Sequence, residues 1–170
     1  MKLGDGVEQA IHCVLVLSAL GEDEVLPAAS LAEFHGVSSS FLLKHLQALS
    51  AASIIVSVPG PKGGYRLARA ADKITLLDVV LAVEGAEPAF RCSEIRQRGP
   101  APVDAKFFKS PCAVNAAMLR AEKAYRSELA NVAITDLSAP PRSSLGAAIT
   151  ERVCGFIELN ARRQPRSEGK

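Results

Sequence analysis

Four side chains in this sequence could bind a metal ion, and they form two pairs. Glu8 and His12 stand four residues apart, so on a helix they lie side by side on one face. A carboxylate and an imidazole placed this way can hold a metal ion, although the same spacing is more typical of a surface ion pair. Cys92 and Cys112 are separated by 19 residues, which matches no short zinc-ligand spacing. The residue types therefore allow a ligand site, but the spacing alone does not require one.

The other cysteines and the other histidines fit structural roles better than chemical ones. Cys13 and Cys154 lie in apolar helical stretches, so we expect both to be buried as small hydrophobic residues. His45 falls on the apolar face of a helix, where a core histidine is more common than a metal ligand. His35 precedes a glycine, and we expect it at the C-terminal end of a helix.

Residues 36–71 carry four basic side chains and no acidic one. In order, they read as a serine-rich helix start, an amphipathic helix, a β-branched strand, a tip rich in proline and glycine, and a second strand. This order predicts a recognition helix followed by a β-wing, because a helix fits the major groove of DNA and a positive wing can contact phosphates. The positions expected to contact DNA are Ser38, Ser39, Ser40, Lys44, Gln47, Lys62, Gly63 and Arg66.

The pattern of apolar residues predicts a mainly α protein, with a winged helix-turn-helix, a two-stranded wing and a long C-terminal dimerisation helix. Helices are expected over 5–20 and 28–34, from a cap at Ser38 or Ser39, and from Thr75 onward. We divide the chain into a DNA-binding domain (1–85), a long loop (86–111), a dimerisation helix region (112–138) and a tail that can form a short helix and ends in basic residues (139–170). Four cations of the loop could lower the pKa of nearby thiols: Arg96, Arg98, Lys106 and Lys109.

The composition is typical of a globular protein, and the segments of the chain indicate its cellular compartment. The chain has 170 residues, of which 48% are hydrophobic, so it can build a core. The apolar run over 10–20 is preceded by acidic residues and interrupted by His12, unlike a signal peptide, and no segment is long enough to cross a membrane. We therefore expect a cytoplasmic protein without structural disulfides or contact with a membrane.

Two motifs resemble those of one family. The helix segment Ser40-Phe-Leu-Leu-Lys-His-Leu-Gln-Ala-Leu and the wing segment Gly-Pro-Lys-Gly-Gly-Tyr-Arg-Leu-Ala are similar to those of the bacterial winged-helix regulators that include IscR and NsrR. The resemblance covers about residues 1–132. It implies a homodimer that binds double-stranded, pseudo-palindromic operator DNA. It also implies an iron–sulfur cluster in the loop before the dimerisation helix, here 86–111.

The loop departs from the IscR and NsrR pattern of three closely spaced cysteines, since it offers only Cys92 and Cys112. The segments that contain these cysteines and the Glu8/His12 pair instead resemble the RsrR-type redox sensors of the family. That resemblance implies a [2Fe–2S] cluster held by Cys92 and Cys112 of one subunit and by Glu8 and His12 of the other.

Two further departures limit what the resemblance implies. Gln9 stands where the RsrR-type sensors have a tryptophan beside the cluster, so an aromatic switch is not carried over. Leu43 replaces an acidic residue of the IscR recognition helix, so the DNA sequence preference is not carried over either.

These observations lead us to expect a homodimeric DNA-binding transcriptional regulator, acting as a repressor, that senses redox state through an intersubunit [2Fe–2S] cluster. An alternative keeps the DNA binding and makes Cys92 and Cys112 a reversible thiol/disulfide pair. A thiol-dependent enzyme would need a nucleophile beside a base in a pocket, and nothing in the sequence indicates one. We therefore do not expect an enzyme.

Overall fold

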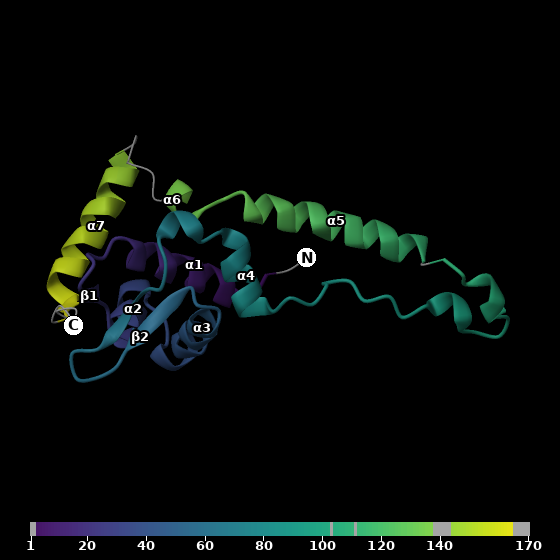
Figure 1. The fold of residues 1–170 in the computed structure, drawn as a ribbon, viewed down its shortest axis with the longest axis horizontal. Coiled ribbons are helices and arrows are strands. Elements are labelled where there is room, and N and C mark those ends of the chain that lie inside the picture. The colour runs from purple at the N-terminus through teal and green to yellow at the C-terminus, as the bar shows by residue number, and fades with distance from the viewer. Residues whose placement is uncertain (1–2, 103, 111, 138–143, 165–170) are drawn as a thin grey trace, which may run out of the picture.

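The structure, a computed structural model, describes residues 3–102, 104–110, 112–137 and 144–164. It is mainly helical, with a body from which one long helix and one loop project together (Figure 1). The helices are α1 (Asp5–Ser18), α2 (Ala28–His35), α3 (Ser39–Ala51), α4 (Leu76–Glu84), α5 (Ala113–Ala130), α6 (Ile134–Leu137) and α7 (Ser144–Asn160). The strands are β1 (Glu24–Val25), β2 (Ile55–Val58), β3 (Gly64–Leu67) and β4 (Arg162–Arg163).

Local sequence signals explain where the helices of the DNA-binding domain begin and end. Gly36 ends α2 in the left-handed conformation, with φ 64°, which glycine adopts without steric cost. Thr75 and Asp78 form a capping box at the start of α4, each side chain accepting a hydrogen bond from the other residue's backbone N–H. Ser38 is the N-cap residue of α3 but its hydroxyl makes no capping bond, because it lies 2.9 Å from the Ser40 hydroxyl instead.

The core is formed by α1, α2, α3 and α4 together with the base of the wing. Its largest fully buried side chains are Leu17, Leu26, Leu31, Leu42, Leu46, Leu49, Ile54, Ile55, Ile74 and Ile134. His45 is buried on α3, as its position on the apolar face predicts. The ring of His45 lies against Gly6 of α1, where an added Cβ would come within 2.3 Å of it. Helices α1 and α3 therefore pack closely at this point, and any larger residue would have to displace the His45 ring.

The predicted wing is confirmed as an antiparallel pair, in which Ile55 lies opposite Leu67 and Val58 opposite Gly64. The tip between the strands turns tightly, since a Cβ on Gly63 would lie 2.1 Å from the carbonyl oxygen of Val58. The wing is also tied to the body by a bridge between Leu26 and Tyr65, closed by hydrogen bonds of 3.0 and 2.8 Å.

The chain leaves the body after α4 and returns through α5 (Figure 1). The expected helix over 112–132 is confirmed as α5, and none of its residues is buried. After α5, the backbone N–H of Ile134 donates to the carbonyl of Ile74 at 2.9 Å, and the Ile134 side chain is fully buried. The region 112–138 therefore combines a projecting helix with a short segment that belongs to the core.

The tail (139–170) is the region in which the structure differs most from the sequence prediction. The short helix predicted within 139–170 is the 17-residue α7, and β4 after it pairs with β1. Cys154 is exposed on α7, so the prediction that it is buried is wrong: it lies on the outer side of a helix whose other face holds Ile157 in the core. Cys13 is buried as predicted. The Pro140-Pro141 segment and the basic end (165–170) lie outside the described residues. Among the described helices, none is both long enough and apolar enough to span a bilayer.

The close approach of α1 to α3 yields a stability prediction with a matched control. Gly6→Ala should lower the free energy of unfolding by about 1–3 kcal/mol, because the new methyl group meets the buried His45 ring. Gly155→Ala, also within a helix, should leave stability unchanged or raise it by up to about 1 kcal/mol, since its Cβ meets nothing. Urea unfolding of both variants checks this, and equal effects would contradict it.

Candidate functional site

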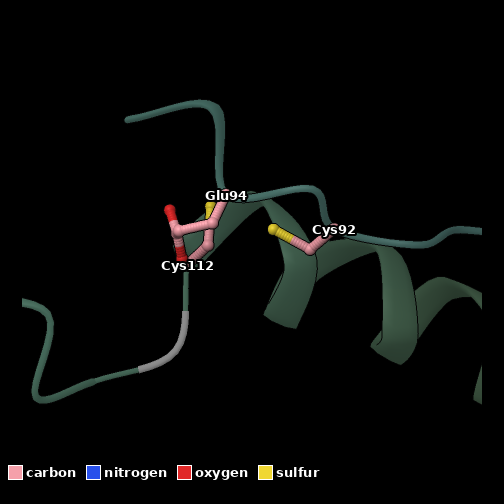
Figure 2. Close-up of side chains that lie close together, drawn as sticks. All are labelled: Cys92, Glu94 and Cys112. Atoms are coloured by element: carbon pink, nitrogen blue, oxygen red, sulfur yellow. The ribbon is translucent and has the colours of Figure 1, made fainter. Parts of the chain in front are cut away.

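Cys92 and Cys112 lie together although 19 residues separate them in sequence. Their sulfur atoms and a carboxylate oxygen of Glu94 all lie within 4.8 Å of one another. Figure 2 shows Cys92 and Glu94 on the loop and Cys112 at the entrance to α5. Cys92 is exposed, whereas Cys112 and Glu94 are half-buried. We call α5 and the loop before it (86–112) the projecting arm. Two thiols and one carboxylate near its outer end can hold a metal centre that is accessible to a second copy of the chain.

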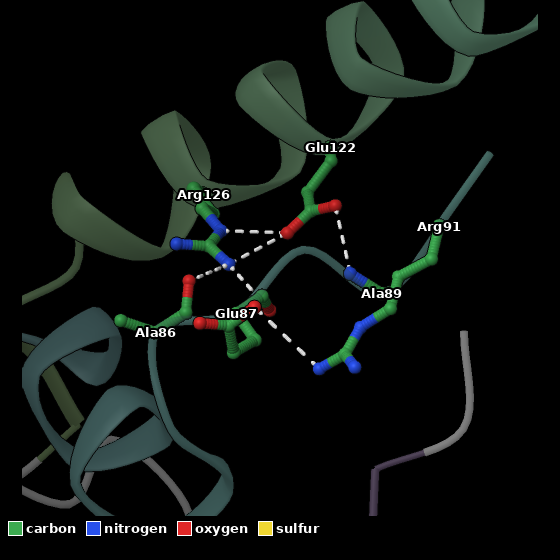
Figure 3. A network of polar contacts seen from close by, with 6 residues as sticks. All are labelled: Ala86, Glu87, Ala89, Arg91, Glu122 and Arg126. Carbon is green, nitrogen blue, oxygen red and sulfur yellow. Dashed lines mark hydrogen bonds and ion pairs between the residues drawn. The ribbon is translucent and has the colours of Figure 1, made fainter.

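The cysteines meet because the start of the loop is fixed along α5 (Figure 3). The Arg126 guanidinium donates to the carbonyls of Ala86 and Glu87 at 2.9 and 3.1 Å, and to Glu122 at 2.9 Å. Glu122 in turn accepts a hydrogen bond of 3.0 Å from the backbone N–H of Ala89. We call Arg126 and Glu122 with these three loop residues the arm clasp. Since the loop runs antiparallel to α5, the clasp brings it toward the N-terminal end of the helix, about 20 Å from Arg126.

Cys112 is the N-cap residue of α5, and this position changes the chemistry of its thiol. Hydrogen bonds from the backbone N–H groups of Asn115 and Val114 are the main causes that lower its pKa. The Arg96 charge and a hydrogen bond with Cys92 add to this effect. Helix N-termini favour thiolates because the unpaired N–H groups point at the sulfur. Cys112 is therefore prepared to act as a ligand or a nucleophile.

Glu94 is held by its own neighbour. Its carboxylate pairs with the Arg96 guanidinium, and this hydrogen bond is the main cause that lowers the pKa of Glu94. The backbone of Glu94 has φ 49°, a left-handed conformation that non-glycine residues seldom adopt. A carboxylate oxygen of Glu94 lies within 4.8 Å of both sulfurs, and Figure 2 shows the carboxylate on the side of Cys112.

Glu8 and His12 are both exposed on α1, as the helical spacing predicts. They border one surface hollow, which Leu3, Val7 and Ile11 line with apolar side chains. Within the described residues, the group of clustered ligand atoms contains neither of them. Helix α1 lies in the body and the N-terminal end of α5 at the far end of the arm (Figure 1). One chain therefore does not bring the Glu8/His12 pair to its own cysteines.

The predicted DNA-contacting residues form an accessible surface on α3 and the wing. Seven of the eight side chains or backbone positions are exposed, and Gly63 is half-buried in the turn. The exposed ones are Ser38, Ser39, Ser40, Lys44, Gln47, Lys62 and Arg66. They lie on α3 and on the neighbouring wing, so their contact with DNA stays a prediction that their exposure allows.

A family profile described as an iron-dependent transcriptional regulator, Rrf2, matches residues 3–140. The chain belongs to the Rrf2 family. It is 30% identical to the helix-turn-helix regulator YffB of Lactococcus lactis over 138 residues, which cover 81% of this chain and 87% of that protein. It is 33% identical to IscR of Vibrio campbellii over 92 residues, about half of each protein (54% and 55%).

Solved structures share the fold of this Rrf2 protein. Oxidized CymR of Staphylococcus aureus has a TM-score of 0.61 at 22% identity, covering 84% of this chain and 100% of that one. IscR of T. potens has a TM-score of 0.58 at 18% identity, covering 81% and 85%. These identities support the fold alone. Together with the family match, they confirm a winged-helix transcriptional regulator and not an enzyme, as expected.

Three residues of the site were not predicted from the sequence of this Rrf2 protein. Glu94 stands two residues from Cys92, and this Cys-x-Glu spacing was the available signal. Glu122 and Arg126 are four apart on one helix, which predicts an ion pair but not its role in holding the loop. That role depends on where the loop runs, which the sequence does not specify.

The different environments of the cysteines predict an order of thiol reactivity. In reduced, chelator-treated protein near neutral pH, iodoacetamide should label Cys112 faster than Cys154, because the lowered pKa of Cys112 gives more thiolate. Cys13 should resist labelling in the folded state, since burial raises its pKa to about 12. Peptide mass spectrometry over time checks this. As pH falls, labelling of Cys112 should persist below the range in which an ordinary thiol is labelled, and equal rates for Cys112 and Cys154 near neutral pH would contradict the prediction.

The arm clasp predicts that a distant residue controls how the cysteines meet. Arg126→Ala removes the donor to two loop carbonyls and to Glu122, at a local cost of about 1–3 kcal/mol. Disulfide formation between Cys92 and Cys112 under mild oxidation of the metal-free protein should therefore slow several-fold. Arg120→Ala, on an exposed position of the same helix, is the control and should have no effect. Equal rates in the two variants would contradict the role of the clasp.

Proposed function

We propose that this protein is a homodimeric transcriptional repressor that senses redox state through a [2Fe–2S] cluster shared between its two subunits. The observation that carries the proposal is the meeting of Cys92 and Cys112 at the N-terminal end of α5. Two cysteines on one chain fit half of the protein ligands that a [2Fe–2S] cluster uses. The family's description as iron-dependent regulators supports the same chemistry.

Glu8 and His12 of the partner subunit are the proposed second half of the ligand set. Both are exposed and side by side on α1, with an apolar hollow beside them that a partner can cover. Within the described residues, the carboxylate grouped with the two sulfurs is that of Glu94, but it is already paired with Arg96. One chain does not bring its Glu8/His12 pair to its Cys92/Cys112 pair. In a dimer, the Glu8/His12 pair of one subunit can lie beside the two cysteines of the other.

Helix α5 supplies the proposed dimer contact. It carries apolar side chains that are 60%, 43% and 41% exposed, namely Val114, Met118 and Leu119. Val114 and Met118 stand four residues apart, so they form a stripe on one side of the helix, with Leu119 at its edge. Burying such a stripe against a second copy removes apolar surface from water, which is the main driving force of association.

The ligand positions offer a direct route from the redox centre to DNA. A [2Fe–2S] cluster supplies one-electron redox chemistry, and nitrogen ligands raise its potential relative to all-thiolate sites. Both proposed α1 ligands lie on the helix whose Gly6 packs against His45 of α3, so a displacement of α1 acts on the recognition helix. Changed spacing between the two recognition helices of a dimer changes its fit to a pseudo-palindromic operator.

A second candidate keeps the DNA binding and replaces the cluster by a disulfide switch. It is favoured by the close approach of the Cys92 and Cys112 sulfurs, within 4.8 Å, and by the lowered pKa of the Cys112 thiol. In this version the thiolate of Cys112 attacks another disulfide, which releases one of its two thiols and leaves a mixed disulfide on Cys112. Cys92 then attacks the Cys112 sulfur and releases the second thiol, so that the Cys92–Cys112 pair is oxidised and the other disulfide is reduced. Glu8 and His12 have no part in that chemistry.

Ligand substitutions distinguish the two functions. Anaerobically purified protein should be coloured and contain about two irons per chain. Glu8→Gln and His12→Ala should lose most of this iron, whereas Glu94→Gln should retain it. Asp5→Asn removes another exposed acid from the first turn of α1 and serves as the control for Glu8→Gln. Iron analysis and visible spectra measure the outcome.

A colourless, iron-free protein after anaerobic reconstitution would overturn the cluster proposal. Reversible oxidation of Cys92 and Cys112 in all of these variants, with a matching change in DNA affinity, would favour the disulfide switch instead. Loss of iron in Glu94→Gln but not in Glu8→Gln would assign the third ligand to the same chain and overturn the shared site.

A further inference from the structure

The C-terminal segment of the chain lies beyond the region that the family profile covers. The profile ends at residue 140, and α7 begins at Ser144. Figure 1 shows α7 on the side of the body opposite the projecting arm, with its C-terminal end directed toward the wing. This segment takes no part in the candidate metal site, and its contacts point to another role.

Helix α7 is firmly docked on α2. The Phe34 and Phe156 rings lie 4.7 Å apart between centroids, and the Arg152 guanidinium stacks over Phe34 at 4.4 Å. Arg152 also donates to the Phe34 carbonyl at 2.8 Å, and Ile157 is 7% exposed within the core. Aromatic and cation–π contacts with a buried anchor fix the helix against the body.

Strand β4 connects the docked helix α7 to the wing. It pairs with β1, with Arg162 opposite Val25. From there the Arg162 guanidinium donates to the Pro61 carbonyl at 2.8 Å and to the Gly63 carbonyl at 3.4 Å. The Gln164 amide donates to the remaining carbonyl between them, that of Lys62, at 2.7 Å. Three consecutive carbonyls of the wing tip thus accept hydrogen bonds from the C-terminal segment.

We propose that α7 and β4 form a brace, added to the family fold, that holds the wing tip in position to contact DNA phosphates. The proposal rests on the DNA binding of the proposed function, and Arg162 and Gln164 are its positioning residues. Without them the tip, a short loop rich in proline and glycine, would be attached through its two strands alone. A braced tip loses less conformational entropy when Lys62 meets a phosphate, so binding is tighter.

The brace acts through the wing, and this distinguishes it from a direct phosphate contact by Arg162. Arg162→Ala should weaken binding to a mixed-sequence DNA duplex by about two- to tenfold, the size expected for loss of a typical intramolecular hydrogen bond. In a Lys62→Ala/Arg66→Ala background the same change should have almost no effect, because the wing no longer contacts phosphates. Gln164→Ala should act in the same direction without any change of charge.

Arg163→Ala is the matched control, since it removes the same charge from the neighbouring residue. Its side chain is 86% exposed and its guanidinium lies 3.7 Å from Glu24, whereas the three wing carbonyls accept from Arg162 and Gln164. It should change DNA affinity less than Arg162→Ala does. Fluorescence anisotropy measures the affinities of all variants.

Amide hydrogen exchange of the free protein tests the brace without DNA. Arg162→Ala and Gln164→Ala should speed exchange in the wing-tip peptide, and Arg163→Ala should not. Unchanged exchange in the first two variants would overturn the brace, and equal loss of affinity in the wing-deficient background would overturn it in favour of a phosphate contact. Failure of the unaltered protein to bind any DNA would overturn the proposed function, while exchange would still show whether the wing is braced.

Discussion

The arm clasp is the contact on which the candidate redox site depends. Arg126 and Glu122 lie about three and a half and two and a half helical turns from the N-terminal end of α5, far from either cysteine, yet they decide where the loop runs. Arg126 binds two loop carbonyls and Glu122 a loop N–H, so backbone groups that would otherwise need water are satisfied by one ion pair. The thiols then meet at a helix N-terminus, where backbone N–H groups stabilise a thiolate.

Helix α1, which carries two of the proposed ligands, and the wing both belong to the same DNA-binding domain. Gly6 brings α1 directly against His45 of α3, so the helix with the proposed partner-facing ligands supports the recognition helix. On another side, Arg162 and Gln164 hold the wing tip. The recognition helix thus packs directly on the helix that carries the proposed ligands, and the wing tip is held by a separate set of contacts. In a dimer, this arrangement favours a change in the spacing of the two α3 helices over a change within either domain.

The winged-helix core could be predicted from the sequence because its signals are local. Apolar spacing marked the helices, Gly36 and Thr75 marked helix ends, and the Gly63-Gly64 pair marked the wing turn. Long-range contacts were not predictable in the same way. Nothing near Cys154 reveals which face of α7 is buried, and nothing near Arg162 indicates that it reaches the wing. Glu8 and His12 were placed correctly on one helix face, but the partner they are proposed to meet lies outside a single chain.

A mixed dimer tests the shared site most directly. One chain carries Cys92→Ala and Cys112→Ala, the other carries Glu8→Ala and His12→Ala, and the two are purified together through different affinity tags. A shared site predicts that neither altered homodimer holds iron, whereas the mixed dimer keeps one intact site and about two irons, since all four ligands meet once. An iron-free mixed dimer, or iron retained by the Glu8→Ala/His12→Ala homodimer, would contradict the account.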